Sequence, residues 1–167
     1  VRLVVGFAPG GVADVTARTV AQKLSEQMGQ PVIVENRPSA GGIVAADAVA
    51  KAEPDGHTLL LMTNGNAVSA SLFRALPYDT VADFVPVSTL CGYVYSFTAG
   101  PGLPAEIKTV ADYIAWARAN PKQALYGIPA AGSALHFAGM LLQRSAKFDF
   151  NSVPYRGGAP LLQDLLG

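Results

Sequence analysis

The chain has 167 residues, of which half are hydrophobic and 14% are charged, and its twelve basic residues balance its twelve acidic ones. This composition is typical of a globular protein that can bury a core, and it excludes a disordered chain. No run of Lys or Arg stands out, so nothing favours nucleic acid or an acidic membrane surface as a partner.

The first half of the sequence alternates predicted strands and helices. The expected elements are strands over Arg2–Gly6, Pro31–Glu35 and Thr58–Thr63, and helices over Val12–Met28 and Gly42–Ala52. Within the first helix, apolar or small side chains recur at helical spacing at Val12, Val15, Thr16, Val20 and Leu24. We expect this stripe to pack on the sheet. Alternation at this spacing predicts βαβ units and a parallel sheet.

The pattern changes between Phe73 and Pro104, where prolines and glycines flank two apolar runs, at 84–90 and 93–98. Adjacent strands without an intervening helix are what a chain crossing from one lobe to another needs. We therefore expect a first lobe over 1–92, an inter-lobe crossing over 93–102 and a second lobe over 103–167.

The α/β alternation resumes after the expected crossing. The expected helices are Thr109–Ala119, Ser133–Ser145 and Gly158–Leu166, and the expected strands are Ala124–Ile128 and Asn151–Pro154. The second lobe is therefore predicted to repeat the architecture of the first, without a repeat in the sequence itself.

The first predicted strand ends in a turn made of Phe7, Ala8, Pro9, Gly10 and Gly11, and a helix follows directly. Such a turn leaves free backbone N–H groups at the positive end of a helix dipole, where an anion can be held. The standard phosphate loops do not fit: Ala8 replaces a required glycine, and no Lys-Ser/Thr pair follows Gly11. A small carboxylate is therefore favoured over a nucleotide. Asp14 either meets a ligand amine or favours the helix dipole.

A second strand-to-helix turn contains Gly132 and Ser133, with Ala134 and His136 in the first helical turn. In one interpretation Ser133 caps the helix and His136 packs locally. In the other, the helix N-terminus and the Ser133 hydroxyl receive a ligand carboxylate from the opposite lobe. As a catalytic pair Ser133 and His136 are weak, because the G-x-S-x-G elbow and a third orienting group are missing. We assign no catalytic residue.

Further candidates lie at other strand ends, where ligands bind in open parallel sheets. In the glycine-rich turn that contains Tyr155, Arg156 either clamps a carboxylate in bidentate fashion or remains a solvated charge. Thr63 and Asn64 either offer polar groups beside the first turn or form an ordinary Asn-Gly turn.

Metal and cofactor sites are not expected, because no cluster of metal ligands occurs in the sequence and the nucleotide-binding loops do not fit. Cys91 is the only cysteine, which excludes an intramolecular disulfide. We expect it to be a small buried residue.

Several motifs occur together and in one order. They are Val4 to Gly11 with Asp14 and Arg18, Val34-Glu35-Asn36-Arg37-Pro38 with Ala40-Gly41-Gly42, Pro54-Asp55-Gly56, Leu76-Pro77-Tyr78-Asp79, Gly132-Ser133 with His136, and Val153-Pro154-Tyr155-Arg156-Gly157. As a set they resemble the Bug-type (TctC-like) periplasmic solute-binding receptors of tripartite tricarboxylate transporters. Two positions depart from that pattern: Ser39, where glycine is common, and Met140, where glutamate is usual.

The resemblance implies two α/β lobes with a small ligand in the cleft, held by main-chain groups and bridging waters and delivered to membrane permease subunits. The implied ligands are mono-, di- or tricarboxylates, amino acids or aromatic acids. It maps the first binding loop onto Phe7 to Gly11 with Asp14, and the second-lobe contact onto Gly132, Ser133 and His136. It also implies a periplasmic protein whose signal peptide and C-terminal part lie outside this chain.

Two alternatives remain open from the sequence. One is an α/β hydrolytic enzyme that uses Ser133 and His136. The other is a sensory module in which the ligand-loaded lobes dock on a signalling partner instead of a permease.

Overall fold

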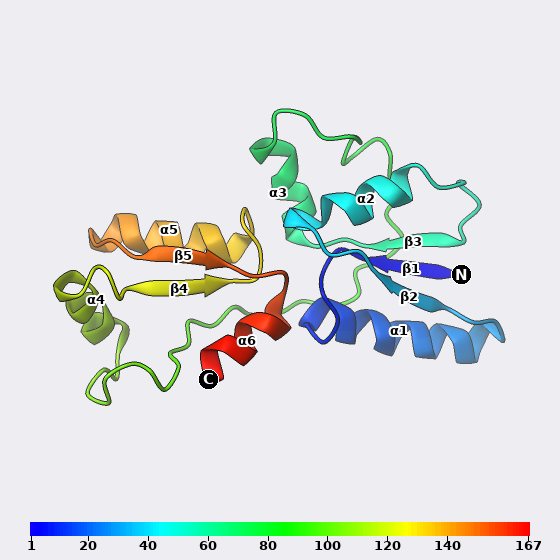
Figure 1. Ribbon diagram of the computed structural model, residues 1–167. Coiled ribbons are helices and arrows are strands. Elements are labelled where there is room, and N and C mark those ends of the chain that lie inside the picture. Colours follow the sequence, from blue (N-terminus) through cyan, green and yellow to red (C-terminus); the bar gives the residue numbers. More distant parts are fainter.

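The first lobe is built on three parallel strands in the order β2-β1-β3 (Figure 1). The strands are β1 (Arg2–Val5), β2 (Ile33–Asn36) and β3 (Thr58–Leu61). The computed structural model describes residues 1–167, except for the side chain of Ala40. The predicted parallel sheet is therefore confirmed, with β1, the most buried strand, in its centre.

Helices cover both faces of this sheet. Helix α1 (Val12–Met28) lies on one face, and α2 (Ile43–Ala50) lies on the other after the short 3-10 turn η1 (Ala40–Gly42). Helix α3 (Asn64–Leu72) follows β3 and packs beside η1 and α2. Helix α3 is not among the predicted elements, because Asn64-Gly65 is also the pattern of an ordinary turn.

The stripe predicted to bury α1 is correct only in part: Leu24 packs against the core, and Thr16 and Val20 are half-buried. Val12 and Val15 are exposed, and the buried face of α1 carries Asp14, Ala17 and Ala21 instead. The alanines pack against Leu3, Val5 and Leu61 of the sheet and against Val32, just before β2. Small side chains let the helix approach the strands closely, whereas valines on the same face would hold it farther away.

A glycine at the end of β1 permits close packing with the start of α2. A Cβ added to Gly6 would lie 2.6 Å from the Cα of Gly42. Gly42 itself has φ +73°, a conformation that favours glycine. These two glycines therefore let the Phe7–Gly11 turn and the start of α2 lie side by side.

The second lobe repeats the strand–helix order on a sheet of two parallel strands. Its elements are α4 (Val110–Ala119), β4 (Leu125–Ile128), α5 (Ala134–Ala146), β5 (Asn151–Pro154) and α6 (Gly158–Leu166). Helices α5 and α6 lie on opposite sides of β4 and β5 (Figure 1). All five agree with the predicted elements to within one residue at each end.

Aromatic residues fill the core of this lobe. Tyr113, Phe148 and Phe150 are buried together with Ala117 and Ala124. The rings of Phe148 and Phe150 stack with centroids 4.9 Å apart, and Tyr113 meets both edge-on. The second lobe therefore obtains its core from ring packing between α4 and the loop that leads into β5.

The segment between α3 and α4 forms neither of the two predicted strands. Its apolar side chains are largely exposed, with Val85 at 88% and Val94 at 96%. A strand needs a neighbour for its backbone hydrogen bonds, and among the described residues no strand pairs with this segment. Cys91 lies here as well and is exposed, so the expectation of a buried cysteine is wrong.

A helix that crosses a membrane needs about 20 predominantly apolar residues. None of the described helices is both long enough and apolar enough to cross a bilayer.

Candidate functional site

The carboxyl ends of the two sheets face each other across the middle of the molecule (Figure 1). The turn after β1 meets the turn after β5, where the Ala8 N–H donates to the Arg156 carbonyl at 3.2 Å. The turns after β4 and β5 are joined by the Gly157 N–H, which donates to the Pro129 carbonyl at 2.9 Å. The structure therefore brings together the three strand-to-helix turns that the sequence analysis selected.

In the first turn, two of the amides that the sequence suggested as free are already used. The Ala8 N–H bonds the opposite lobe, and the Gly10 N–H donates to the Asp14 carboxylate at 2.9 Å. The amides of Val12 and Ala13, in the first turn of α1, have no acceptor among the described residues. The helix N-terminus thus retains unsatisfied donors next to the Phe7–Gly11 turn.

Asp14 is buried, with 3% of its surface exposed, and both its oxygens are occupied. Arg18 Nε donates to it at 3.0 Å and Asn36 Nδ2 at 2.9 Å. Burial raises the pKa of Asp14. Hydrogen bonds from Arg18, the Gly10 N–H and Asn36, together with the charge of Arg18, lower it by more, so the pKa of Asp14 lies below its ordinary value of 3.8. Asp14 lies in the first turn of α1, as the predicted role at the helix dipole requires. It also contacts the preceding turn, through the Gly10 N–H.

In the second turn, Ser133 is the N-cap of α5, as one interpretation of the sequence predicted. Its Oγ accepts from the backbone N–H of His136 at 3.3 Å. The His136 ring accepts at Nδ1 from the Gly132 N–H at 3.1 Å, which places the proton of the neutral ring on Nε2. The backbone amides of Ala134 and Leu135 have no acceptor in the described part of the chain.

Ser133 and His136 are therefore not arranged as a nucleophile and its base. The ring nitrogen Nε2 lies 3.5 Å from the Ser152 hydroxyl, and the Ser133 hydroxyl contacts the backbone of His136. A general base has to accept the proton of the nucleophile directly. This geometry gives no support to hydrolysis by the pair.

The third turn carries Tyr155 and Arg156. The Tyr155 hydroxyl donates to Asp164 of α6, and this hydrogen bond is the main cause that raises the pKa of Tyr155. The Arg156 side chain is exposed, while its carbonyl makes the inter-lobe bond to Ala8. Gly157 follows with φ +128°, and a Cβ there would lie 3.4 Å from the Ala8 nitrogen. Glycine at this position lets the two turns approach.

Thr63 and Asn64 lie at the start of α3. The Thr63 N–H donates to Asn66 Oδ1 at 3.0 Å, and Asn64 Nδ2 donates to the Tyr95 hydroxyl of the segment between the lobes. Helix α3 also reaches the second turn, since a Cβ on Gly132 would lie 2.6 Å from Leu72 Cδ1. The two residues therefore start a helix that contacts the other lobe.

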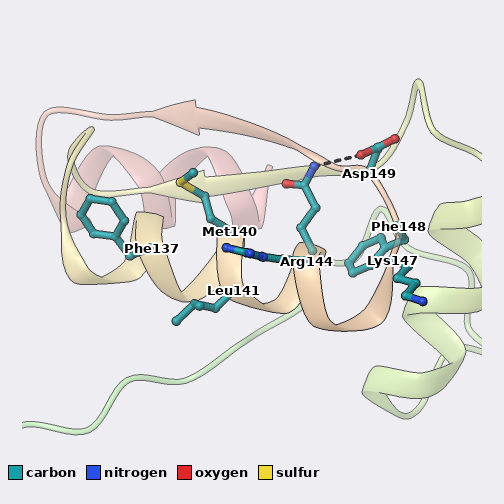
Figure 2. A pocket seen from close by; sticks show the side chains of 8 residues that line it. Phe137, Met140, Leu141, Arg144, Lys147, Phe148 and Asp149 are labelled. Atoms are coloured by element: carbon teal, nitrogen blue, oxygen red, sulfur yellow. Dashed lines mark hydrogen bonds between the residues drawn. The ribbon is translucent and has the colours of Figure 1, made fainter.

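Two cavities lie away from these turns. One of about 600 Å³ runs along α5 and is shown in Figure 2, where Phe137, Met140, Leu141 and Arg144 line it from the helix. A second, of about 370 Å³, lies between α1 and β2. Met140, one of the two departures from the family pattern, thus lies on an exposed face of α5.

Asn36 was missed as a candidate. It is the last residue of β2, and its Nδ2 donates both to Asp14 Oδ1 and to the Phe7 carbonyl, at 2.9 and 3.0 Å. Its place at the carboxyl end of a strand beside the first turn was the available signal.

Two α/β lobes, each with a sheet of parallel strands and with the carboxyl ends of these strands facing each other, define the class of two-lobed periplasmic-binding-protein folds. The family model described as "Tripartite tricarboxylate transporter family receptor" matches residues 16–167. The chain therefore belongs to this receptor family, and the resemblance found in the sequence is confirmed.

Relatives of known sequence and structure agree with this assignment. Protein BugT of Bordetella pertussis is 37% identical over 169 residues, which cover 100% of this chain and 51% of BugT. The solved structure of R. palustris Rpa4515 with adipate is 36% identical with a TM-score of 0.87, and covers 99% of this chain and 55% of that one. MatC (Rpa3494) from Rhodopseudomonas palustris with bound malate is 32% identical, with a TM-score of 0.81 and coverage of 99% and 56%. The chain thus spans about half the length of the relatives it matches.

Proposed function

We propose that this chain is part of a periplasmic solute-binding receptor that captures a small carboxylate between two lobes and delivers it to the permease of a tripartite tricarboxylate-type transporter. Family membership supports the receptor class. Two structural relatives are described with adipate and with malate, both dicarboxylates. A receptor that loads a transporter has to meet its solute outside the inner membrane, which supports the periplasmic location.

The observation that carries the proposal is the meeting of three helix-starting turns at facing strand ends. Helices α1, α5 and α6 all begin there, and each presents the positive end of its dipole to the same region. The carboxylate in the first turn of α1, Asp14, is paired with Arg18, and the carboxylate of Asp164 in α6 accepts a hydrogen bond from Tyr155. An added anion therefore meets N–H donors and the exposed Arg156, which pairs with no carboxylate among the described residues.

The proposed contacts fall into two groups, one from each lobe. The first lobe contributes Phe7, Ala8, Pro9, Gly10, Gly11, Asp14, Thr63 and Asn64, and the second contributes Gly132, Ser133, Ala134, His136, Tyr155 and Arg156. Since several of these amides already have partners in the protein, we propose that part of the contact to the ligand passes through bridging waters.

The lobe boundaries are part of the same proposal. We place the first lobe at 1–92, the crossing at 93–102 and the second lobe at 103–167. Support comes from the stretch between α3 and α4, which forms neither helix nor strand and connects the two sheets.

Calorimetric titration of the 167-residue protein with adipate and with malate tests the proposal. We expect saturable binding of at least one acid, no binding of the neutral adipamide, and no chemical change in the recovered ligand. Binding of the diamide as tightly as the acid would contradict a site built for an anion. Consumption of an ester or amide that Ser133→Ala abolishes would favour an enzyme instead.

A matched pair of serine variants locates the site on α5. Ser133 caps the helix at the inter-lobe turn, whereas Ser145 lies near the other end and bonds the Leu141 carbonyl. Ser133→Ala is expected to weaken adipate or malate binding, and Ser145→Ala is expected to leave it unchanged. Equal effects of the two substitutions would place the ligand elsewhere.

A further inference from the structure

Asp14 is a buried carboxylate whose hydrogen bonds connect three separate elements. Its Oδ2 accepts from the Gly10 N–H in the turn and from Arg18 in α1, at 2.9 and 3.0 Å. Its Oδ1 accepts from Asn36 at the end of β2, at 2.9 Å. A buried carboxylate is stable only when its charge and lone pairs are satisfied, so these three contacts have to form together.

Asn36 completes this network and extends it to the turn. Its Nδ2 donates to the Phe7 carbonyl at 3.0 Å as well as to Asp14, and its Oδ1 accepts from Arg18 Nη2 at 3.1 Å. The turn is therefore held at both ends, at Phe7 through Asn36 and at Gly10 through Asp14. Gly10 has φ +83°, a conformation that the Asp14 contact helps to select.

The network also determines the electrostatics of the turn. An uncompensated Asp14 at the start of α1 would repel a carboxylate, and Arg18 cancels that charge. Asn36 holds the Arg18 guanidinium and the Asp14 carboxylate from the same side chain, one through its oxygen and the other through its nitrogen. Loss of Asn36 therefore changes both the shape of the turn and the placement of the compensating charge.

We propose that Asn36 is a positioning residue that sets the geometry of the Phe7–Gly11 turn and, through it, the affinity of that turn for a carboxylate. This inference rests on the proposed function, since it concerns how the same site is held. Asn36 acts through Asp14, Arg18 and the Phe7 carbonyl and does not itself contact the ligand.

Asn36→Ala tests the inference with two independent readouts. The first is amide hydrogen exchange at Gly10 and Gly11, followed by NMR, which reports on the turn without any ligand. The second is the affinity for adipate and malate. Removal of hydrogen bonds of ordinary net strength is expected to raise exchange and weaken binding by about tenfold each. Amides of β4 and α5 should keep their exchange rates.

Asn151→Ala is the matched control. Asn151 is an exposed asparagine on the strand β5, and its side chain makes no hydrogen bond within the part of the chain that the structure describes. The Asn151→Ala substitution should leave both readouts unchanged. Asn36→Asp keeps the size and the acceptor for Arg18, loses both donated bonds and adds a charge beside Asp14. It should impair the turn at least as strongly as Asn36→Ala, and it carries the test if Asn36→Ala does not fold.

The outcomes separate the inference from the proposed function. If the unsubstituted protein binds neither acid, the proposed function fails for this chain, and the exchange at Gly10 alone decides whether Asn36 positions the turn. If Asn36→Ala leaves the exchange at Gly10 unchanged, the inference is wrong. It is also wrong if exchange rises equally throughout β1, β2 and β3, because Asn36 would then only stabilise the lobe.

Discussion

The two lobes share one strand–helix order but fill their cores with different side chains. In the first lobe, Ala17 and Ala21 of α1 pack on Leu3 and Val5 of the central strand. In the second, the core consists of stacked and edge-on rings around Phe150, and α5 buries none of its residues. The same architecture is thus reached by close approach of a helix in one lobe and by large side chains in the other.

This difference predicts that the lobes depend on different kinds of contact. Loss of a ring should damage the second lobe most, whereas the first should respond to any change in its closely packed aliphatic core. The buried apolar residues form a separate cluster in each lobe, so the lobes need not unfold together. Lobe-resolved hydrogen exchange is therefore the appropriate measure for the following substitutions.

Removal of the central ring should have the largest effect. Phe150→Ala is expected to lower the free energy of unfolding of the second lobe by about 3–5 kcal/mol, the usual cost for a buried phenylalanine. Phe97→Ala, at a half-exposed ring that meets Tyr113 edge-on, is the control and should cost much less. Denaturant unfolding monitored by tryptophan fluorescence of Trp116 measures both. Equal losses would contradict a core centred on Phe150.

Truncation of the aliphatic core should come next. Leu3→Ala removes a side chain that is 4% exposed and should cost the first lobe about 2–4 kcal/mol. Leu125→Ala, at a half-exposed leucine on β4, should cost little. Exchange of the β1 and β3 amides should rise in Leu3→Ala while amides of β4 and β5 keep their rates. A rise in both lobes would show that they unfold as one unit.

Asp14 should make the stability of the first lobe depend on pH. Because its pKa is lower in the folded state than its ordinary value of 3.8, its contribution is fully present above that value and is lost as the pH falls through the folded pKa. Asp14→Asn should cost about 1–3 kcal/mol near pH 7, as for a charged hydrogen bond. The difference from the unsubstituted protein should shrink below about pH 4. A pH-independent difference in thermal unfolding would contradict this assignment.

The smallest expected effect concerns the cap of α5. Ser133→Ala should lower stability by about 1 kcal/mol, because the His136 N–H loses its acceptor. Ser133→Gly should cost only a few tenths of a kcal/mol. If calorimetric unfolding ranks these two variants in the reverse order, the contribution of Ser133 lies in something other than the cap.

Most of the fold was predictable from the sequence because its elements have strong local patterns. The run of apolar residues in β1 and the Pro-Gly-Gly turn fixed the start of α1, and Ser133 marked the start of α5. The face of α1 was partly mispredicted because hydrophobicity alone favours Val12 and Val15, whereas packing distance selects Ala17 and Ala21. The two strands expected between the lobes depend on pairing partners, which local sequence does not specify.

The candidate site was predictable in position but not in detail. Strand-to-helix turns are visible in the sequence, and the three selected turns do meet in the structure. The use of the Ala8 amide by Arg156, and of the Gly10 amide by Asp14, depends on tertiary contacts that no spacing reveals. The role of Asn36 was hidden for the same reason, since its partners lie 22 and 29 residues away in the sequence.

The central claim is that a carboxylate binds where the turns of the two lobes meet. A titration of the isotope-labelled protein with adipate and with malate, followed by amide NMR shifts, tests it most directly. We predict saturable shifts at Gly10 and Gly11 in one lobe and at Gly132 and Gly157 in the other, for at least one acid. Shifts confined to the α5 cavity around Met140 and Arg144, or to one lobe alone, would contradict it.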